Sequence, residues 1–152
     1  MTIAWIYLDK KLAAVDALKD YASMEYIINH HSGRLAEVKE NMIALPSAVI
    51  TGLPKQPNPH SGEDRLASSL DEIDVLKERY RRALQFMEWF APAWNTLSEE
   101  EQLILTEFFL REGISKAEAL LNLGDILNIE RAQVYRRKDK AVDHLALLLY
   151  GK

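Results

Sequence analysis

The chain has 152 residues, of which 48% are hydrophobic and 28% charged, values typical of one globular domain or two small ones rather than a disordered chain. It contains no cysteine, which excludes disulfides and thiolate metal sites and fits a cytoplasmic location. The net charge of −4 argues against a protein that coats nucleic acid through bulk charge. We expect no membrane span and no signal peptide, because no apolar run is long enough and the first eleven residues lack a basic leader and a cleavage site.

Residues 1–93 are predicted to form a long helical hairpin. From about Thr2 to Leu45, apolar residues recur every three or four positions, close to a heptad, and His30 to Gly33 is a weak point where the helix is expected to kink or break. Residues 46–62 hold four prolines and two glycines and are predicted to be a connector. The two apolar stripes comprise Trp5, Leu8, Leu12, Val15, Leu35, Val38, Met42 and Leu45, then Leu66, Leu70, Ile73, Tyr80, Leu84, Met87 and Phe90.

An aromatic cluster surrounds Pro92, which is expected to end or kink the second helix. The cluster comprises Trp89, Phe90, Trp94 and Leu97. We interpret it as a core between the two halves of the chain; the alternative is an exposed patch that docks a partner. The hairpin stripes are also long enough to support a homodimer.

Residues 94–152 are predicted to form three helices. Ser98 with Glu101, and Ser115 with Glu118, have the spacing of capping boxes, and Gly113 is expected to stop the first helix. Asn128 falls where the chain must turn and tolerates the left-handed conformation. The last helix is predicted from about Arg131 to Leu149, with Val134, Ala141, Leu145 and Leu148 on its buried side.

The charge changes sign at the start of this last helix. Residues 97–129 hold two basic and seven acidic side chains, a net charge of −5, whereas residues 130–152 hold six basic and three acidic ones, a net charge of +3. We therefore expect only the last segment to meet phosphate.

Two capped helices, a tight turn and a basic helix are the components of a helix-turn-helix. Its second helix needs an apolar back and a front that reaches base edges and phosphates, which Arg, Gln and Lys can do. The predicted contacts to double-stranded DNA are Arg131, Ala132, Gln133, Tyr135, Arg136, Arg137, Lys138 and Lys140. On residue chemistry alone, a solvated basic helix end packed on a bundle explains the same residues equally well.

The segment from Asn128 to Arg136 (Asn-Ile-Glu-Arg-Ala-Gln-Val-Tyr-Arg), followed by Lys140-Ala141-Val142, resembles the turn and recognition helix of region four of bacterial sigma factors. In that family, region four binds the promoter element upstream of the start site. In layout the whole chain also resembles small transcriptional regulators of Gram-positive phages and prophages, which join a helical N-terminal half to a region-four-like C-terminal half through a Pro/Gly-rich connector. The motif is specific only over about residues 97–149.

The resemblance implies base contacts from Arg131, Ala132 and Arg136, with backbone or neighbouring contacts from Gln133, Tyr135 and Lys140. Three features depart from the family pattern. Glu130 stands where members usually have a small hydroxyl residue, and Asn128 stands where they usually have glycine. The segment 113–123 is also longer by about one helical turn, which is expected to re-aim the recognition helix.

The sequence therefore predicts an all-α, sequence-specific DNA-binding regulator of phage or prophage type that recruits or modifies RNA polymerase. It has no counterpart of the sigma regions that melt the promoter, so we do not expect a complete sigma factor. Two alternatives remain: a helical adaptor or oligomerisation protein, and a phage DNA-packaging recognition subunit. Neither enzyme activity, a cofactor nor a metal site is expected, since no catalytic motif or ligand spacing occurs, and His30, His31, His60 and His144 are interpreted as incidental.

Overall fold

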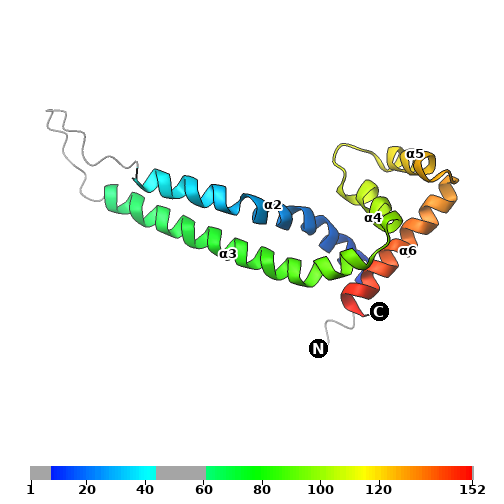
Figure 1. Cartoon of the computed structure of the whole chain (residues 1–152), viewed down its shortest axis with the longest axis horizontal. Coiled ribbons are helices and arrows are strands. Elements are labelled where there is room, and N and C mark those ends of the chain that lie inside the picture. Colours follow the sequence, from blue (N-terminus) through cyan, green and yellow to red (C-terminus); the bar gives the residue numbers. More distant parts are fainter. Residues whose placement is uncertain (1–7, 44–60, 152) are drawn as a thin grey trace. The chain divides into compact units, whose positions relative to one another are not determined.

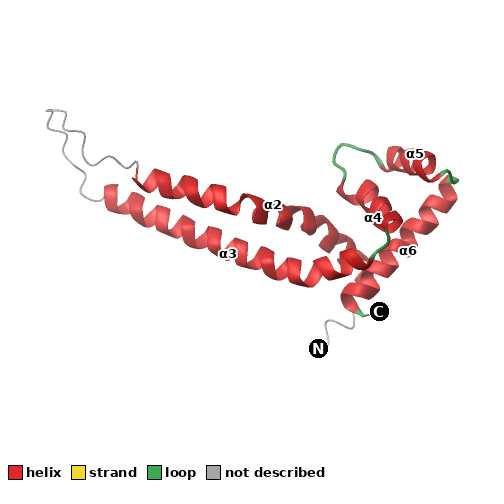
Figure 2. Cartoon of the chain, viewed as in Figure 1, coloured by secondary structure: helices red, strands yellow, loops and turns green. Residues whose placement is uncertain are grey.

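A computed structural model describes residues 8–43 and 61–151, which form helices and no strands (Figure 2). The predicted all-α class is thus confirmed. Trp5, Leu45 and most of the predicted connector 46–62 lie outside the described residues; the last two residues of that connector begin a helix. The elements are α2 (Lys10–Ile43), α3 (Ser61–Thr96), α4 (Glu99–Leu105), the π-helical turn η1 (Thr106–Leu110), α5 (Lys116–Leu127) and α6 (Arg131–Tyr150).

The described residues form two compact units, and both α2 and α3 contribute to each. The small unit is Glu25–Leu84, and the large unit takes the described residues up to Met24 together with those from Gln85. This division differs from the predicted boundary at residue 93, because the ends of α2 and α3 share a core with α4 and α6.

In the small unit, α2 and α3 pair in antiparallel fashion. The His31 ring stacks on Tyr80 with centroids 4.1 Å apart, and Arg34 on α2 forms an ion pair with Glu72 on α3 at 2.7 Å. The buried and half-buried positions alternate at spacings of three and four residues, as in a two-stranded coiled coil. They are Ile28, His31, Leu35, Val38 and Met42 on α2, facing Ile73, Leu76, Tyr80 and Ala83 on α3.

Two predictions about the hairpin are wrong. The helix does not break at His30 to Gly33, because α2 is continuous from Lys10 to Ile43 and its histidines are held by aromatic neighbours: His30 stacks on Tyr26 at 3.9 Å and donates from Nδ1 to the Tyr26 carbonyl at 2.9 Å. The predicted stripes are also out of phase in part. Residues expected to be buried but found exposed are Leu8, Leu12, Leu66, Leu70 and Leu84.

The large core of the large unit joins α2, α3, α4 and α6. Within it the Tyr21 ring stacks on Phe90 and on Trp94, with centroids 5.0 Å and 5.7 Å apart. The expected core around Pro92 is thus confirmed for Phe90 and Leu97, whereas Trp89 is exposed. The buried members are Ala14, Ala17, Leu18, Phe90, Ala93, Leu97, Leu105, Ala141, Val142, Leu145, Ala146 and Leu149.

Of the two outcomes expected at Pro92, an end or a kink, the first does not occur, since α3 runs on to Thr96. A proline removes one backbone hydrogen bond and crowds the preceding turn, but this one lies in the last turns of the helix. Burial of Phe90 and Ala93 on either side holds these turns against the large core, and the Thr96 hydroxyl donates to the Pro92 carbonyl at 2.7 Å.

The caps of the C-terminal helices confirm the sequence prediction. The Ser98 hydroxyl accepts from the Glu101 N–H at 3.2 Å while the Glu101 carboxylate accepts from the Ser98 N–H at 2.8 Å. Ser115 and Glu118 form the same pair of bonds, at 3.2 Å and 2.9 Å. Gly113 has the expected positive φ, of 75°, although the helical turns already end at Leu110, through the π-helical η1 that the sequence did not predict.

In the described part of the chain, no helix combines the length and apolarity needed to cross a lipid bilayer.

Candidate nucleic-acid interface

The turn between α5 and α6 is three residues long. Asn128 adopts the left-handed conformation (φ 54°, ψ 48°), as predicted, and its N–H donates to the Gly124 carbonyl. The Ile129 N–H donates to the same carbonyl at 3.1 Å. A Cβ added at Gly124 would lie 3.2 Å from the Ile129 carbonyl oxygen, closer than most real contacts. Glycine at 124 and a left-handed residue at 128 therefore let α6 begin directly after α5.

Figure 1 shows the order of α4, α5 and α6 along the chain, and a small core of side chains holds these three helices together. Its buried members are Ile104, Leu120, Leu123 and Val134, which come from all three helices. Ile129 in the turn packs against them, as expected for an apolar plug, together with Leu103, Phe108 and Leu127. Val134 is fully buried in the small core, so one side of the first turns of α6 is held against the protein. The opposite side of these turns faces solvent.

Six of the eight predicted DNA contacts are exposed: Arg131, Ala132, Gln133, Tyr135, Arg136 and Lys140. Among the residues that the structure describes, Arg131, Arg136 and Lys140 take part in no ion pair. Their charges are therefore available to a ligand. Tyr135 is exposed, but its ring lies 6.3 Å from the Phe108 ring, at the edge of the small core.

The other two predicted contacts, Arg137 and Lys138, are engaged within the fold. The Arg137 guanidinium forms an ion pair with the Glu100 carboxylate of α4. The Lys138 ammonium lies 5.3 Å and 5.1 Å from the ring centroids of Phe108 and Tyr135, within cation–π range, and its side chain is only 22% exposed. Both residues lie on sides of α6 that face other parts of the protein, so their cationic ends help to hold α6 against α4 and η1.

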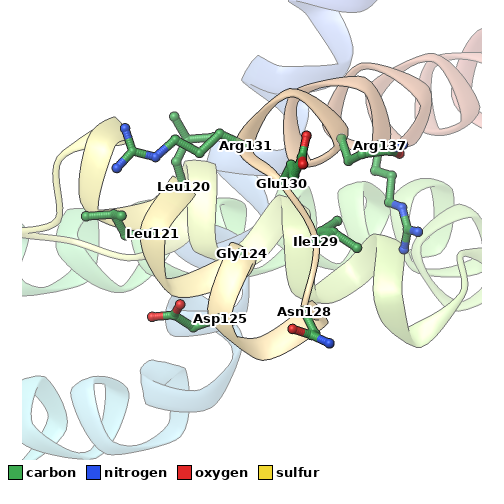
Figure 3. Close-up of a pocket in the computed structure, with 10 residues that line it drawn as sticks. Leu120, Leu121, Gly124, Asp125, Asn128, Ile129, Glu130, Arg131 and Arg137 are labelled. Atoms are coloured by element: carbon green, nitrogen blue, oxygen red, sulfur yellow. The ribbon is translucent and has the colours of Figure 1, made fainter.

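An open groove of about 790 Å³ lies beside the α5–α6 turn (Figure 3). Asp125 and Glu130 line it as well as Arg131 and Arg137, whose side chains extend from opposite sides of it. Glu130 occupies the N-cap of α6 in an extended conformation without a side-chain capping bond. Since the lining charges are balanced, the groove is not built to concentrate an anion, and the exposed cations on α6 are the better candidates for phosphate.

Two acidic residues at the start of α4 form side-chain contacts with α6. Besides the Glu100–Arg137 pair, the Glu101 carboxylate lies 2.8 Å from Nδ1 of His144. An ionised carboxylate can only accept, so Nδ1–H is the donor. Partial burial acts to raise the pKa of Glu101, but the Ser98 N–H and the His144 contact outweigh it and hold that pKa below its usual 4.5. His144 was therefore not incidental; no sequence signal joins two residues so far apart in the chain.

Over the described ranges, no three His, Cys, Asp or Glu side chains gather closely enough to hold a metal ion. Comparison of the chain with protein-family models, curated proteins and solved structures finds no match.

Proposed function

We propose that this chain is a DNA-binding transcriptional regulator of phage or prophage type, which inserts the first half of α6 into the major groove. One observation carries the proposal: Arg131, Arg136 and Lys140 are exposed and unpaired, with Gln133 beside them, on a helix whose back is fixed by Val134. A recognition helix needs this combination of a packed back and a polar front. The short turn at Asn128 and the small core support it, because they fix the position of the helix that carries these side chains.

The side chains suggest how such a helix would select sequence. Arginine can donate two hydrogen bonds to guanine and glutamine can pair with adenine, whereas lysine chiefly contacts phosphate. Arg131, Gln133 and Arg136 are therefore assigned to base edges and Lys140 to the backbone. Ala132, being small, allows close approach of the helix to the groove floor. Arg137 and Lys138 are assigned to orienting the helix and no longer to direct contact.

The test is selection of bound sequences from a random duplex library at near-physiological salt. The wild type is compared with Arg131→Ala/Arg136→Ala and with Arg65→Ala/Arg79→Ala, a control pair that removes the same charge from exposed positions on α3. An enriched motif that survives in the control and disappears in the α6 variant supports the proposal. Equal enrichment by all three proteins, or none by the wild type, contradicts it.

Contact with RNA polymerase belongs to the same proposal and rests on the resemblance to sigma region four. The acidic residues at the start of α4 are poor candidates for that contact, because Glu100 and Glu101 already bind Arg137 and His144. Glu99 is exposed and is the remaining acidic candidate for a polymerase contact in this turn. A pull-down with purified polymerase, with and without the selected duplex, tests this part; recovery of no polymerase under either condition contradicts it.

A helical adaptor is the second candidate. The coiled-coil pairing of α2 and α3 in the small unit favours it, since that pairing involves none of the α6 cations. If the adaptor function is correct, the DNA selection yields no motif.

A further inference from the structure

The small unit has a thin core for its length. Among its described residues, the buried hydrophobic ones are Val38, Ile73 and Ala83, and the other heptad positions are half-buried. Two helices packed along a single seam leave most of each surface in water, and a helical module of this kind usually buries a second face.

One flank of α3, next to the seam with α2, carries a row of apolar residues in solvent. Leu66, Leu70 and Leu84 are 44%, 49% and 38% exposed. With Asp74, Lys77 and Arg81 they follow each other at spacings of three or four residues, so all six lie along one side of the helix. This row, Leu66 to Leu84, is named the α3 flank.

The charges of α3 are segregated along its length. Residues 63–74 hold five acidic side chains and one basic, whereas residues 77–82 hold four basic and one acidic. Two pairs of like charges stand four residues apart: Asp74 and Glu78, and Lys77 and Arg81. Such pairs destabilise an isolated helix, where alternating signs would stabilise it. Glu78 binds Arg81 and Arg82 within the helix, but Asp74 and Lys77 have no ion-pair partner among the described residues.

A segment that is acidic over residues 63–74 and basic over residues 77–82 is complementary to itself when reversed. We propose that the α3 flank packs against the α3 flank of a second copy of this chain, antiparallel, about a two-fold axis between Asp74 and Lys77. Asp74 of each copy then lies opposite Lys77 of the other, and Leu66 lies near Leu84. A parallel pair would instead oppose Asp74 to Asp74, so charge selects the antiparallel arrangement.

The contact would run along residues 61–84, a helix of about 36 Å at 1.5 Å per residue. Combined with the adjoining face of α2, that is long enough for a four-helix bundle of two hairpins. The inference does not depend on DNA binding, because no α6 residue takes part.

The test is the mass of the full-length chain by analytical ultracentrifugation across a concentration series. The wild type is expected to approach twice its 17.4 kDa. Asp74→Lys and Lys77→Asp are each expected to raise the dissociation constant about tenfold or more, since each alters two ion pairs per dimer. An equimolar mixture of the two variants restores wild-type affinity, because the lysine introduced by the first substitution then faces the aspartate introduced by the second.

The matched control is Arg79→Asp, which reverses a positive charge as Lys77→Asp does but at an exposed position about 160° around the helix from Lys77, at 100° per residue. It is expected to dimerise like the wild type. Circular dichroism confirms that each variant is helical, and Leu70→Gln gives a further variant with no charge change. A monomeric wild type, an assembly insensitive to Asp74→Lys, or a mixture that fails to recover overturns the proposal.

Discussion

The substitution Glu101→Gln separates the charge of this residue from its capping role. Glutamine can still accept the Ser98 N–H bond in a capping box, so the loss is confined to two effects of the negative charge. The first is its attraction to the N-terminus of α4, worth about 0.5 kcal/mol. The second is the hydrogen bond from His144, worth up to about 1 kcal/mol at a partly buried site. We expect Glu101→Gln to destabilise the protein by about 1–1.5 kcal/mol at pH 7, lowering Tm by roughly 4 °C.

The pH dependence of this loss has a definite sign. The pKa of Glu101 is lowered in the folded protein, so the native state favours the charged form. Its contribution to stability is present above the unfolded pKa of 4.5 and is lost as pH falls through the folded pKa. The difference in stability between wild type and Glu101→Gln should therefore be present at pH 7 and shrink as pH falls through the folded pKa of Glu101.

Thermal melts followed by circular dichroism between pH 7 and pH 3 measure this difference. Glu118→Gln is the matched control, because Glu118 caps α5 in the same way without a histidine partner. Its effect should be about 0.5 kcal/mol. The reasoning would be refuted by an equal effect of the two substitutions at pH 7, or by a wild-type–Glu101→Gln difference that persists unchanged in acid.

Three further predictions concern α5, the turn and the exposed face of α6. Asn128→Ala should destabilise the protein by about 1 kcal/mol in urea denaturation, since a Cβ without a hydrogen-bonding group disfavours positive φ, whereas Asn128→Gly should be neutral or better; equal values for both would contradict the role of the turn. Leu123→Ala should cost about 3 kcal/mol because the side chain is fully buried, against less than about 0.5 kcal/mol for its exposed neighbour Leu121→Ala; similar costs would deny the small core. If α6 binds DNA as proposed, Lys140→Ala should weaken all duplexes alike and reduce the slope of log K against log salt by about one, and a loss confined to one sequence would make Lys140 a base contact.

The locally encoded features could be predicted from the sequence. Both capping boxes, the left-handed Asn128 and the start of α6 at Arg131 depend on residues within four positions of one another. The sequence also identified the burial of Val134, Ala141 and Leu145, because α6 has a clear apolar side.

The phase of the long helices could not be predicted in the same way. Leu8 and Leu12 fit a helical stripe as well as Ala14, Ala17 and Leu18 do, and the larger side chains were favoured. Which stripe is buried depends on the partner helix, and small alanines are buried where α2 approaches its neighbours closely. Arg137 was predicted to contact DNA because its partner could not be identified from the sequence. That partner, Glu100, stands 37 residues earlier, and only the fold brings the two together.

The helix α6 has its first turns in the small core and its later turns in the large core, through Val134 at one end and Leu145 and Leu149 at the other. The later turns of α6 are therefore fixed by packing against the ends of α2 and α3, and a rotation there moves the first turns. Ala132 lies about 20 Å along the axis from Leu145 at 1.5 Å per residue. A tilt of α6 by only about 5° at Leu145 would displace the exposed face near Ala132 by roughly 2 Å. That is enough to break a contact of two hydrogen bonds such as arginine makes with a base. A substitution in the large core would therefore shift the exposed face of α6 without changing any residue of that face.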